Sequence, residues 1–164
     1  MSVELAKMTR ELFHELYRSF EYDPVMFADE AEYEKYRHYE YNADKVDAHF
    51  DRRSVEENRV SFAVLLDGRV IGEAVLKHID LDSKQCELGI HLINGSVKNR
   101  GYGTEAERLA LHYAFDVLGI EAVLADCLVN NLRSRHVIEK LGFEFLYEKD
   151  GFGFYRLDRQ SFTE

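Results

Sequence analysis

The sequence predicts a mixed α/β (α+β) fold: a mostly antiparallel central sheet with one β-α-β crossover and with helices on both faces. The first observation is a change of hydrophobic period at Arg59, from the helical period of about 3.6 residues to the period of about two typical of strands. The second is Asp67-Gly68 between two apolar runs, which favours a type I′ hairpin turn and therefore an antiparallel pair. The third is a later strand–helix–strand order, which requires a crossover between parallel neighbours.

The N-terminal part, residues 1–58, is predicted to be mainly helical. Residues 3–8 can form a short strand, and Thr9 is a suitable N-cap for a helix whose apolar residues lie three and four apart. Residues 21–42 are rich in aromatic side chains and are expected to be irregular, and residues 43–58 are expected to form another helix.

The later elements follow from apolar runs and turn residues. Gly119 and Gly142 are expected to end helices, and Lys149-Asp150-Gly151 to join the last two strands. The predicted strands are 60–66, 70–79, 86–93, 121–128, 143–148 and 153–158, and the predicted helices are 103–118 and 131–141. Because no linker or repeat interrupts them, residues 1–164 are expected to form one domain, with parts 1–58, 59–128 and 129–164.

Composition excludes several classes of protein. The chain has 31 acidic and 21 basic residues, so its net charge is −10, which opposes binding to nucleic acid. No apolar run approaches the roughly 18 residues that cross a bilayer, and residues 1–10 do not resemble a secretory signal. Cys86 and Cys127 have no zinc-binding spacing and are expected to be buried thiols of a cytoplasmic protein that needs no metal.

The segment from Lys98 to Thr104 predicts an anion site, because it leads from a strand into a helix. Gly101 and Gly103 allow backbone N–H groups to turn inward, and the helix start attracts negative charge. Lys98 and Arg100 add two positive charges with no acidic residue beside them. A phosphate or pyrophosphate is the ligand that this arrangement favours.

Other phosphate-binding patterns fit less well. A Walker A loop is excluded because no Gly-Lys-Ser/Thr is present. Gly101, Gly103 and Ala106 match the dinucleotide pattern, with Asp126 where a ribose-binding acid would lie, but about seven residues separate the strand from the glycines and too little chain follows for a second half. A dinucleotide-binding oxidoreductase therefore stays a weak alternative, as does a plain surface turn.

Two segments together resemble the GNAT superfamily of N-acetyltransferases. Residues 98–103, Lys-Asn-Arg-Gly-Tyr-Gly, resemble its Gln/Arg-x-x-Gly-x-Gly/Ala motif, and residues 131–143 resemble its later Asn-x-x-Ser…Glu-Lys-x-Gly-Phe segment. The likeness covers about residues 60–158 and is close to the subgroup that includes ribosomal-protein N-terminal acetyltransferases. It implies a GNAT-like fold and transfer of an acetyl group from acetyl-coenzyme A to a primary amine, a peptide N-terminus or a small amine, in a ternary complex.

The resemblance also implies which residues bind the coenzyme. The loop amides would hold the pyrophosphate, and backbone groups on the preceding strand would hold the pantetheine arm and polarise the acetyl carbonyl. The residues so assigned are His91, Leu92, Ile93, Lys98, Asn99, Arg100, Gly101, Tyr102, Gly103, Thr104, Asn131 and Arg133. Asn131 is equally well explained as the N-cap of its helix.

Candidate catalytic residues lie on the strand before the loop. Alternation places Glu87 and His91 on one face, and Leu88, Ile90 and Leu92 on the opposite, core face. Glu87 resembles the family's general base, although a purely structural carboxylate explains it equally well. His91 is expected to assist by relaying a proton, and Glu73 on the neighbouring strand is a further candidate base.

The leaving thiolate presents a departure from the family. Ile138 stands where many members have a proton-donating tyrosine, so either Ser134 donates the proton or the thiolate leaves unprotonated. The two cysteines lie within apolar strands, which disfavours a cysteine nucleophile. The missing tyrosine leaves open a catalytically silent module that binds or senses acyl-coenzyme A.

The acceptor is the least determined part of the prediction. Between residues 21 and 50 nine acidic residues stand among many aromatic ones with only three basic residues, a combination that attracts a cationic amine. Amphipathic helices with a solvated acidic face explain the same pattern. No oligomeric interface is specified, so a homodimer stays open.

Overall fold

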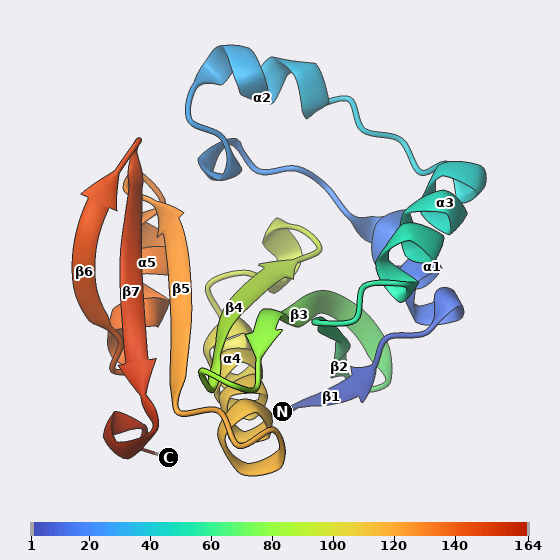
Figure 1. The fold of residues 1–164 in the computed structure, drawn as a ribbon. Coiled ribbons are helices and arrows are strands. Elements are labelled where there is room, and N and C mark those ends of the chain that lie inside the picture. Colours follow the sequence, from blue (N-terminus) through green and yellow to red (C-terminus); the bar gives the residue numbers. More distant parts are fainter. Residues whose placement is uncertain (1, 164) are drawn as a thin grey trace.

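A computed structural model describes residues 2–163, in which seven strands form one sheet in the order β1-β2-β3-β4-β5-β7-β6. All neighbouring strands are antiparallel except β4 and β5, which are parallel. The strands are β1 (Val3–Lys7), β2 (Val60–Leu66), β3 (Arg69–Asp80), β4 (Gln85–Leu92), β5 (Ala122–Leu128), β6 (Glu144–Lys149) and β7 (Phe152–Asp158). The predicted mixed sheet with one crossover is confirmed (Figure 1).

Helices cover both faces of the sheet, as predicted (Figure 1). Helices α1 (Arg10–Ser19) and α3 (Ala43–Ser54) pack on one face, and α4 (Tyr102–His112) and α5 (Leu132–Lys140) pack on the other. Helix α2 (Glu30–Tyr36) lies apart, arching from the α1/α3 side toward the β6–β7 hairpin. Within residues 2–163, none of the helices has the length and apolar character needed to cross a membrane.

The turns form where the sequence places them. Asp67 and Gly68 have φ values of 51° and 79°, and Asp150 and Gly151 have 54° and 83°, as hairpin turns with two left-handed residues require. Gly119, with a φ of 71°, follows the crossover helix.

Three expected helical boundaries differ from the structure. Residues 21–42 are not irregular throughout, because Asp29 caps α2 by accepting the Glu32 N–H at 2.8 Å, and Pro24–Met26 form a 3₁₀ turn. Helix α3 ends at Ser54 rather than 58, since the polar residues that follow give it no further apolar face to bury. The helix expected at 103–118 consists of α4 and a π-helical turn, Tyr113–Val117.

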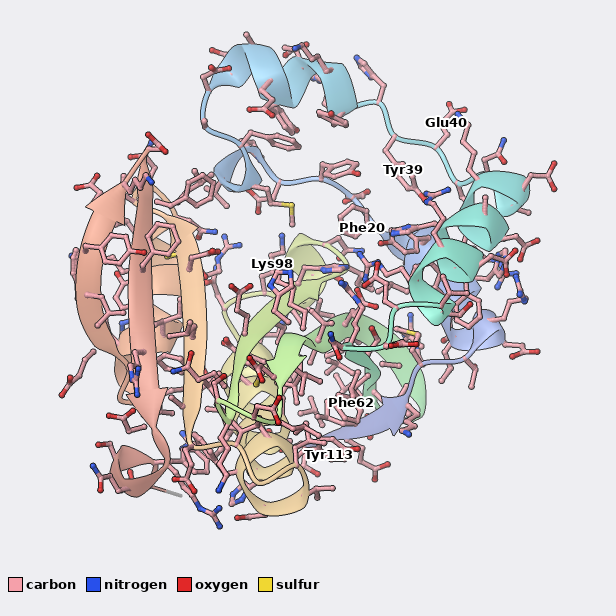
Figure 2. All side chains as sticks on the ribbon, in the orientation of Figure 1. Phe20, Tyr39, Glu40, Phe62, Lys98 and Tyr113 are labelled. Carbon is pink, nitrogen blue, oxygen red and sulfur yellow. The ribbon has the colours of Figure 1, made fainter. Side chains whose placement is uncertain are left out.

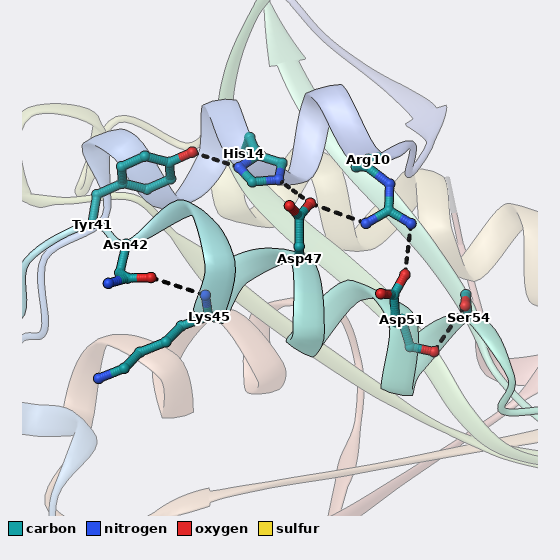
Figure 3. A network of polar contacts seen from close by, with 8 residues as sticks. All are labelled: Arg10, His14, Tyr41, Asn42, Lys45, Asp47, Asp51 and Ser54. Carbon is teal, nitrogen blue, oxygen red and sulfur yellow. Dashed lines mark hydrogen bonds and ion pairs between the residues drawn. The ribbon is translucent and has the colours of Figure 1, made fainter.

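Polar contacts fasten α1 to α3 outside the core (Figure 3). The Arg10 guanidinium lies 3.0 Å from an Asp47 oxygen and 2.6 Å from an Asp51 oxygen, and His14 contacts both Asp47 and Tyr41. These contacts, with the apolar residues beneath them, hold the N-terminal helices against β2 and β3.

The parallel pair β4–β5 is short, and this feature creates the site. Only three residue pairs join the strands, Gln85 with Ala122, Cys86 with Val123 and Glu87 with Leu124. Strand β4 then runs on to Leu92 and β5 to Leu128 without pairing to each other. The sheet is therefore two halves that are joined at one end and part toward the other.

Candidate active site

A cleft of about 460 Å³ lies where β4 and β5 part. Strand β4 contributes Ile90, His91 and Leu92 to its lining. The other lining residues come from three places: α4 (Gly103, Glu107), the α5 region (Asn131, Arg133, Ser134, Val137), and the loop and N-terminal segments (Tyr17, Phe20, Tyr22, Val25, Met26, His49, Arg53, Lys98). The expected assignment of Ile90 and Leu92 to the core is corrected, because the parting of the strands opens their side to the cleft, whereas Leu88 is buried as expected.

Backbone groups of β4 are only partly available to a ligand. The Ile93 N–H donates to the Ile71 carbonyl at 2.8 Å, and the Ile93 carbonyl accepts from the Glu21 N–H at 2.7 Å. Ile93, assigned above to coenzyme binding, therefore has both backbone groups occupied and its side chain in the core. Since backbone groups alternate between the two sides of a strand, those of His91 face β3 and those of Leu92 face the gap.

The N-terminus of α4 is open at the mouth of the cleft. Gly101 occupies the N-cap with a φ of 85°, and no side chain caps the helix. A Cβ at Gly101 would meet nothing within 4 Å, and one at Gly103 would meet only Leu92 Cδ1, at 3.9 Å. The first N–H groups of the helix are thus exposed beside a glycine surface, an arrangement that fits a phosphate group.

The two loop cations have different surroundings. Arg100 is exposed, and its Nε donates to the Ser96 carbonyl at 3.1 Å. Lys98 is buried near the centre of the molecule (Figure 2), with its Nζ 3.1 Å from Asp23 Oδ2. Arg133 Nη1 lies 3.3 Å from that same Asp23 oxygen. One carboxylate therefore holds cations from both halves of the sheet.

The pKa of Asp23 lies below its ordinary value. Burial on its own would raise the pKa, but the Val25 N–H and the cations of Lys98 and Arg133 outweigh it. Asp23 is ionised at neutral pH and links the segment after α1 to the loop and to α5.

His91 is a neutral side chain inside the cleft. Its ring packs edge-to-face on Phe20, with centroids 5.4 Å apart, and its Nε2 has no hydrogen-bond partner among the residues described. Burial, helped by the charges of Arg53 and Lys98, lowers the pKa of His91 to about 4. The ring can therefore accept a hydrogen bond from a ligand at neutral pH.

The two candidate carboxylates do not lie in this cleft. Glu87 Oε2 is 2.8 Å from His78 Nδ1, and the side chain lines a neighbouring cavity of about 360 Å³ that also contains Asp126. Glu73 pairs in register with His91, but its Oε1 contacts Arg53 at 3.2 Å. Glu73 lines a different hollow, so its carboxylate does not face the cleft.

Two side chains line both the cleft and the neighbouring cavity: Glu107 and Ser134. Ser134 has its N–H capped by Asn131 Oδ1 at 3.1 Å, so Asn131 is the N-cap of α5 as one of the two expectations held, and it also lines the cleft. Burial raises the pKa of Glu107 to about 8. Ile138, by contrast, is buried in the core.

Aromatic rings, rather than acids, form the N-terminal wall of the cleft. Phe20 and Tyr22 line it and continue into further ring contacts with Tyr39 and with Phe27, which stacks on Tyr36 at 5.3 Å. Most acidic residues of 21–50 are exposed, for example Glu30, Glu32 and Glu34 on α2, and only Asp23 reaches the cleft cations. The expected aromatic and acidic wall is thus divided into an aromatic lining and an acidic exterior.

Both cysteines are free and buried, as predicted. Burial, with a smaller effect from Glu87, raises the pKa of Cys86 to about 12, and burial also raises that of Cys127. Within residues 2–163, no group of three or more His, Cys, Asp or Glu side chains could hold a metal ion.

A family model described as "Acetyltransferase (GNAT) domain" matches residues 4–144. The chain belongs to the GNAT acetyltransferase family. Among its GNAT relatives in Bacillus subtilis (strain 168), "Putative ribosomal N-acetyltransferase YdaF" is 30% identical over 92 residues, 56% of this chain and 50% of that protein. "Probable N-acetyltransferase YjcK" is 32% identical over 88 residues, 54% and 49% of the two chains. These matches span only about half the length of either relative.

Solved GNAT structures confirm the fold over nearly the whole chain. A spermidine N-acetyltransferase SpeG chimera from Vibrio cholerae and hSSAT superposes with a TM-score of 0.75 at 16% identity, covering 98% of this chain and 97% of that one. An acetyltransferase from T. thermophilus gives a TM-score of 0.74 at 22% identity, covering 98% and 88%. At such identities the likeness concerns the fold alone.

Three cleft residues of this GNAT domain lay beyond the sequence reasoning. Asp23 comes from a segment with no motif, and its contacts with Lys98 and Arg133 span 75 and 110 residues. Ile90 belonged to a core pattern. Glu107 carried one usable signal, because it lies four residues after Gly103 and so on the same side of the helix.

Proposed function

We propose that this chain is an acetyl-coenzyme A-dependent N-acetyltransferase that moves the acetyl group directly to a primary amine. The observation that carries the proposal is the parting of β4 and β5 beside the open N-terminus of α4. A phosphate group at the helix start and an arm between the strands need these two features next to each other.

Coenzyme binding is assigned to groups at the cleft mouth and along its walls. The backbone N–H groups of residues 99–104 would face the pyrophosphate, with the exposed Arg100 side chain beside it. The Leu92 backbone and Asn131 would bond the pantetheine amides. Lys98 and Arg133 add positive potential, shared with Asp23.

The acceptor is proposed to enter beside the aromatic wall, where cation–π contact favours an ammonium group. Glu87 is proposed to take the amine proton. It pairs with Leu124 in the last residue pair of β4 and β5, it is partly exposed, and it lines the cavity that adjoins the cleft. The neutral His91 is proposed to accept a hydrogen bond from the amine or from a water molecule.

The test is turnover with a panel of nucleophiles. The protein is incubated with acetyl-coenzyme A and with peptides having free N-termini, polyamines, amino sugars, and neutral or anionic nucleophiles. Free thiol release and product mass are measured. Because the printed names of relatives and neighbours include a ribosomal N-acetyltransferase and a spermidine N-acetyltransferase, both kinds of amine belong in the panel. Acetylation of neutral or anionic nucleophiles alone would contradict an amine acceptor.

A silent acyl-coenzyme A sensor is the second candidate, favoured by the buried Ile138 at the position of the usual tyrosine. Tight coenzyme binding without turnover on any amine would support it. Glu87→Gln then tests the base: turnover should fall while coenzyme binding is retained.

A further inference from the structure

Glu107 is a carboxyl group for which the fold provides no partner. It projects from α4 into the region where β4 and β5 part, and it is 5% exposed. No hydrogen bond or ion pair reaches it within residues 2–163. A buried carboxyl group without a partner is costly to keep, so its place in the cleft calls for a functional reason.

The position of Glu107 relative to the loop is fixed by the helix. It follows Gly101 by six residues, which is about 9 Å of α-helix, and it shares a helix face with Gly103. A coenzyme with its phosphates at the start of α4 would extend its arm into the cleft toward this side chain. The reactive sulfur lies at the end of that arm, away from the phosphates.

Glu107 also lies where the cleft meets the cavity that contains Glu87, since it lines both. The amine and the thioester must meet between these two spaces if the acceptor enters beside Glu87. Glu107 and Ser134 are the polar side chains common to both linings.

The ionisable groups around Glu107 come from every element that lines the two spaces. They are His49 and Arg53 from α3, Lys77 from β3, Glu87 and His91 from β4, Lys98 from the loop, Asp126 and Cys127 from β5, Arg133 from α5 and Tyr155 from β7. None of them bonds to the Glu107 carboxyl group. The raised pKa of about 8 has burial as its cause.

We propose that Glu107 is the acid that protonates the coenzyme sulfur during acetyl transfer. As the amine nitrogen bonds to the acetyl carbon and the carbon–sulfur bond breaks, the electron pair of that bond goes to sulfur, and the Glu107 proton goes with it. The proton lost by the amine nitrogen passes to Glu87, and it or a solvent proton restores Glu107 after product release. Glu107 thereby supplies the function that Ile138 cannot. This inference rests on the proposed function.

The activity test uses Glu107→Gln, which keeps the size and polarity of the neutral acid but cannot release a proton. We expect kcat at pH 7 to fall about 10- to 100-fold, at the low end of general-acid contributions. The wild-type kcat should decline above about pH 8, as Glu107 ionises, and the variant should lack that decline. An unchanged kcat with an unchanged alkaline limb would overturn the assignment.

A second readout does not require turnover. The thiolate absorbance of bound coenzyme A is titrated in both proteins from about pH 7 to 10. Ionised Glu107 beside the sulfur disfavours the thiolate, so the bound thiol should titrate at higher pH in the wild type than in Glu107→Gln. Equal titrations would overturn the contact.

The matched control is Glu105→Gln on the same helix. Glu105 accepts the Val3 N–H at 3.1 Å and does not line the cleft. It should leave the alkaline limb and the thiol titration unchanged, and a shift as large as that of Glu107→Gln would contradict a local role. Coenzyme binding without turnover on any amine would overturn the acetyltransferase proposal, while the thiol titration would still decide whether Glu107 faces the sulfur. Failure to bind coenzyme A would overturn both.

Discussion

A single ionisable side chain can tie stability to pH. Glu107 has a raised pKa, so at neutral pH it must bind a proton on folding that the unfolded chain has lost. Its cost to stability is absent below the unfolded pKa of about 4.3, grows as pH rises, and levels off near pH 8. The fold retains a carboxyl group that weakens it under the conditions in which we expect it to act.

Glu107→Gln should therefore stabilise the protein at neutral pH. Because the pKa rises from 4.5 to about 8, the relief at pH 7 is about 3 kcal/mol, and little remains near pH 4.5. Urea unfolding of wild type and variant from pH 4.5 to 8 measures it. A difference in free energy of unfolding that does not change with pH would contradict the buried neutral acid.

The ion pairs of Asp23 differ from those on the surface, because Lys98 is buried. Asp23→Asn should lower the free energy of unfolding by about 1–3 kcal/mol, since it leaves a buried ammonium without its carboxylate. The control is Glu34→Gln, which breaks an exposed pair with Arg37 and should cost less than about 0.5 kcal/mol. Urea unfolding compares the two, and equal losses would contradict a special role for Asp23.

At the scale of elements, the start of α4 shows what sequence can and cannot predict. The glycines, the charges and the following helix predict an anion site, because the ends of a helix expose N–H groups whatever the fold around them. The extent of the β4–β5 pairing is not encoded in either strand, since both remain strand-like beyond Glu87 and Leu124. Whether the strands stay paired depends on the residues that fill the space between them.

Gly101→Ala should weaken coenzyme A binding about tenfold or more. The added Cβ would project from a residue with a φ of 85° into open space at the helix start, and the strain should cost about 1 kcal/mol of stability. Gly95→Ala is the matched control, because Gly95 has open space around it without a left-handed backbone, and its affinity should change less than twofold. Calorimetric titration with coenzyme A measures both, and equal affinities would contradict a phosphate site at Gly101.

At the scale of the whole molecule, a net charge of −10 coexists with a cleft that contains Arg53, Lys98 and Arg133. The acidic residues of α2 lie outside it, on a helix that arches between the two sides of the molecule (Figure 1). This arrangement draws a cationic acceptor by its long-range field while the anionic coenzyme meets local positive charge.

Replacing Glu30, Glu32 and Glu34 together by Gln should lower kcat/KM for a polyamine about two- to tenfold at low salt, through slower association. The KM for acetyl-coenzyme A and kcat/KM for a monoamine should change little. The effect should vanish at high salt, where exposed charges are screened. Steady-state kinetics at two ionic strengths measures it, and an equal loss for both amines would contradict steering by α2.

The sequence by itself determined the features that arise from neighbouring residues. Periodicity, turn residues and caps predict most elements, and the glycine loop with the Asn131 segment indicates the family, because these signals come from contacts within a few residues. Only the tertiary structure decided which side chains share the cleft. It brought Asp23 to Lys98, placed Glu87 in the adjoining cavity, occupied the backbone of Ile93 and put Glu107 beneath the parted strands. The physical reason is that these placements depend on where β4 and β5 stop pairing, which is settled by packing among residues far apart in the chain.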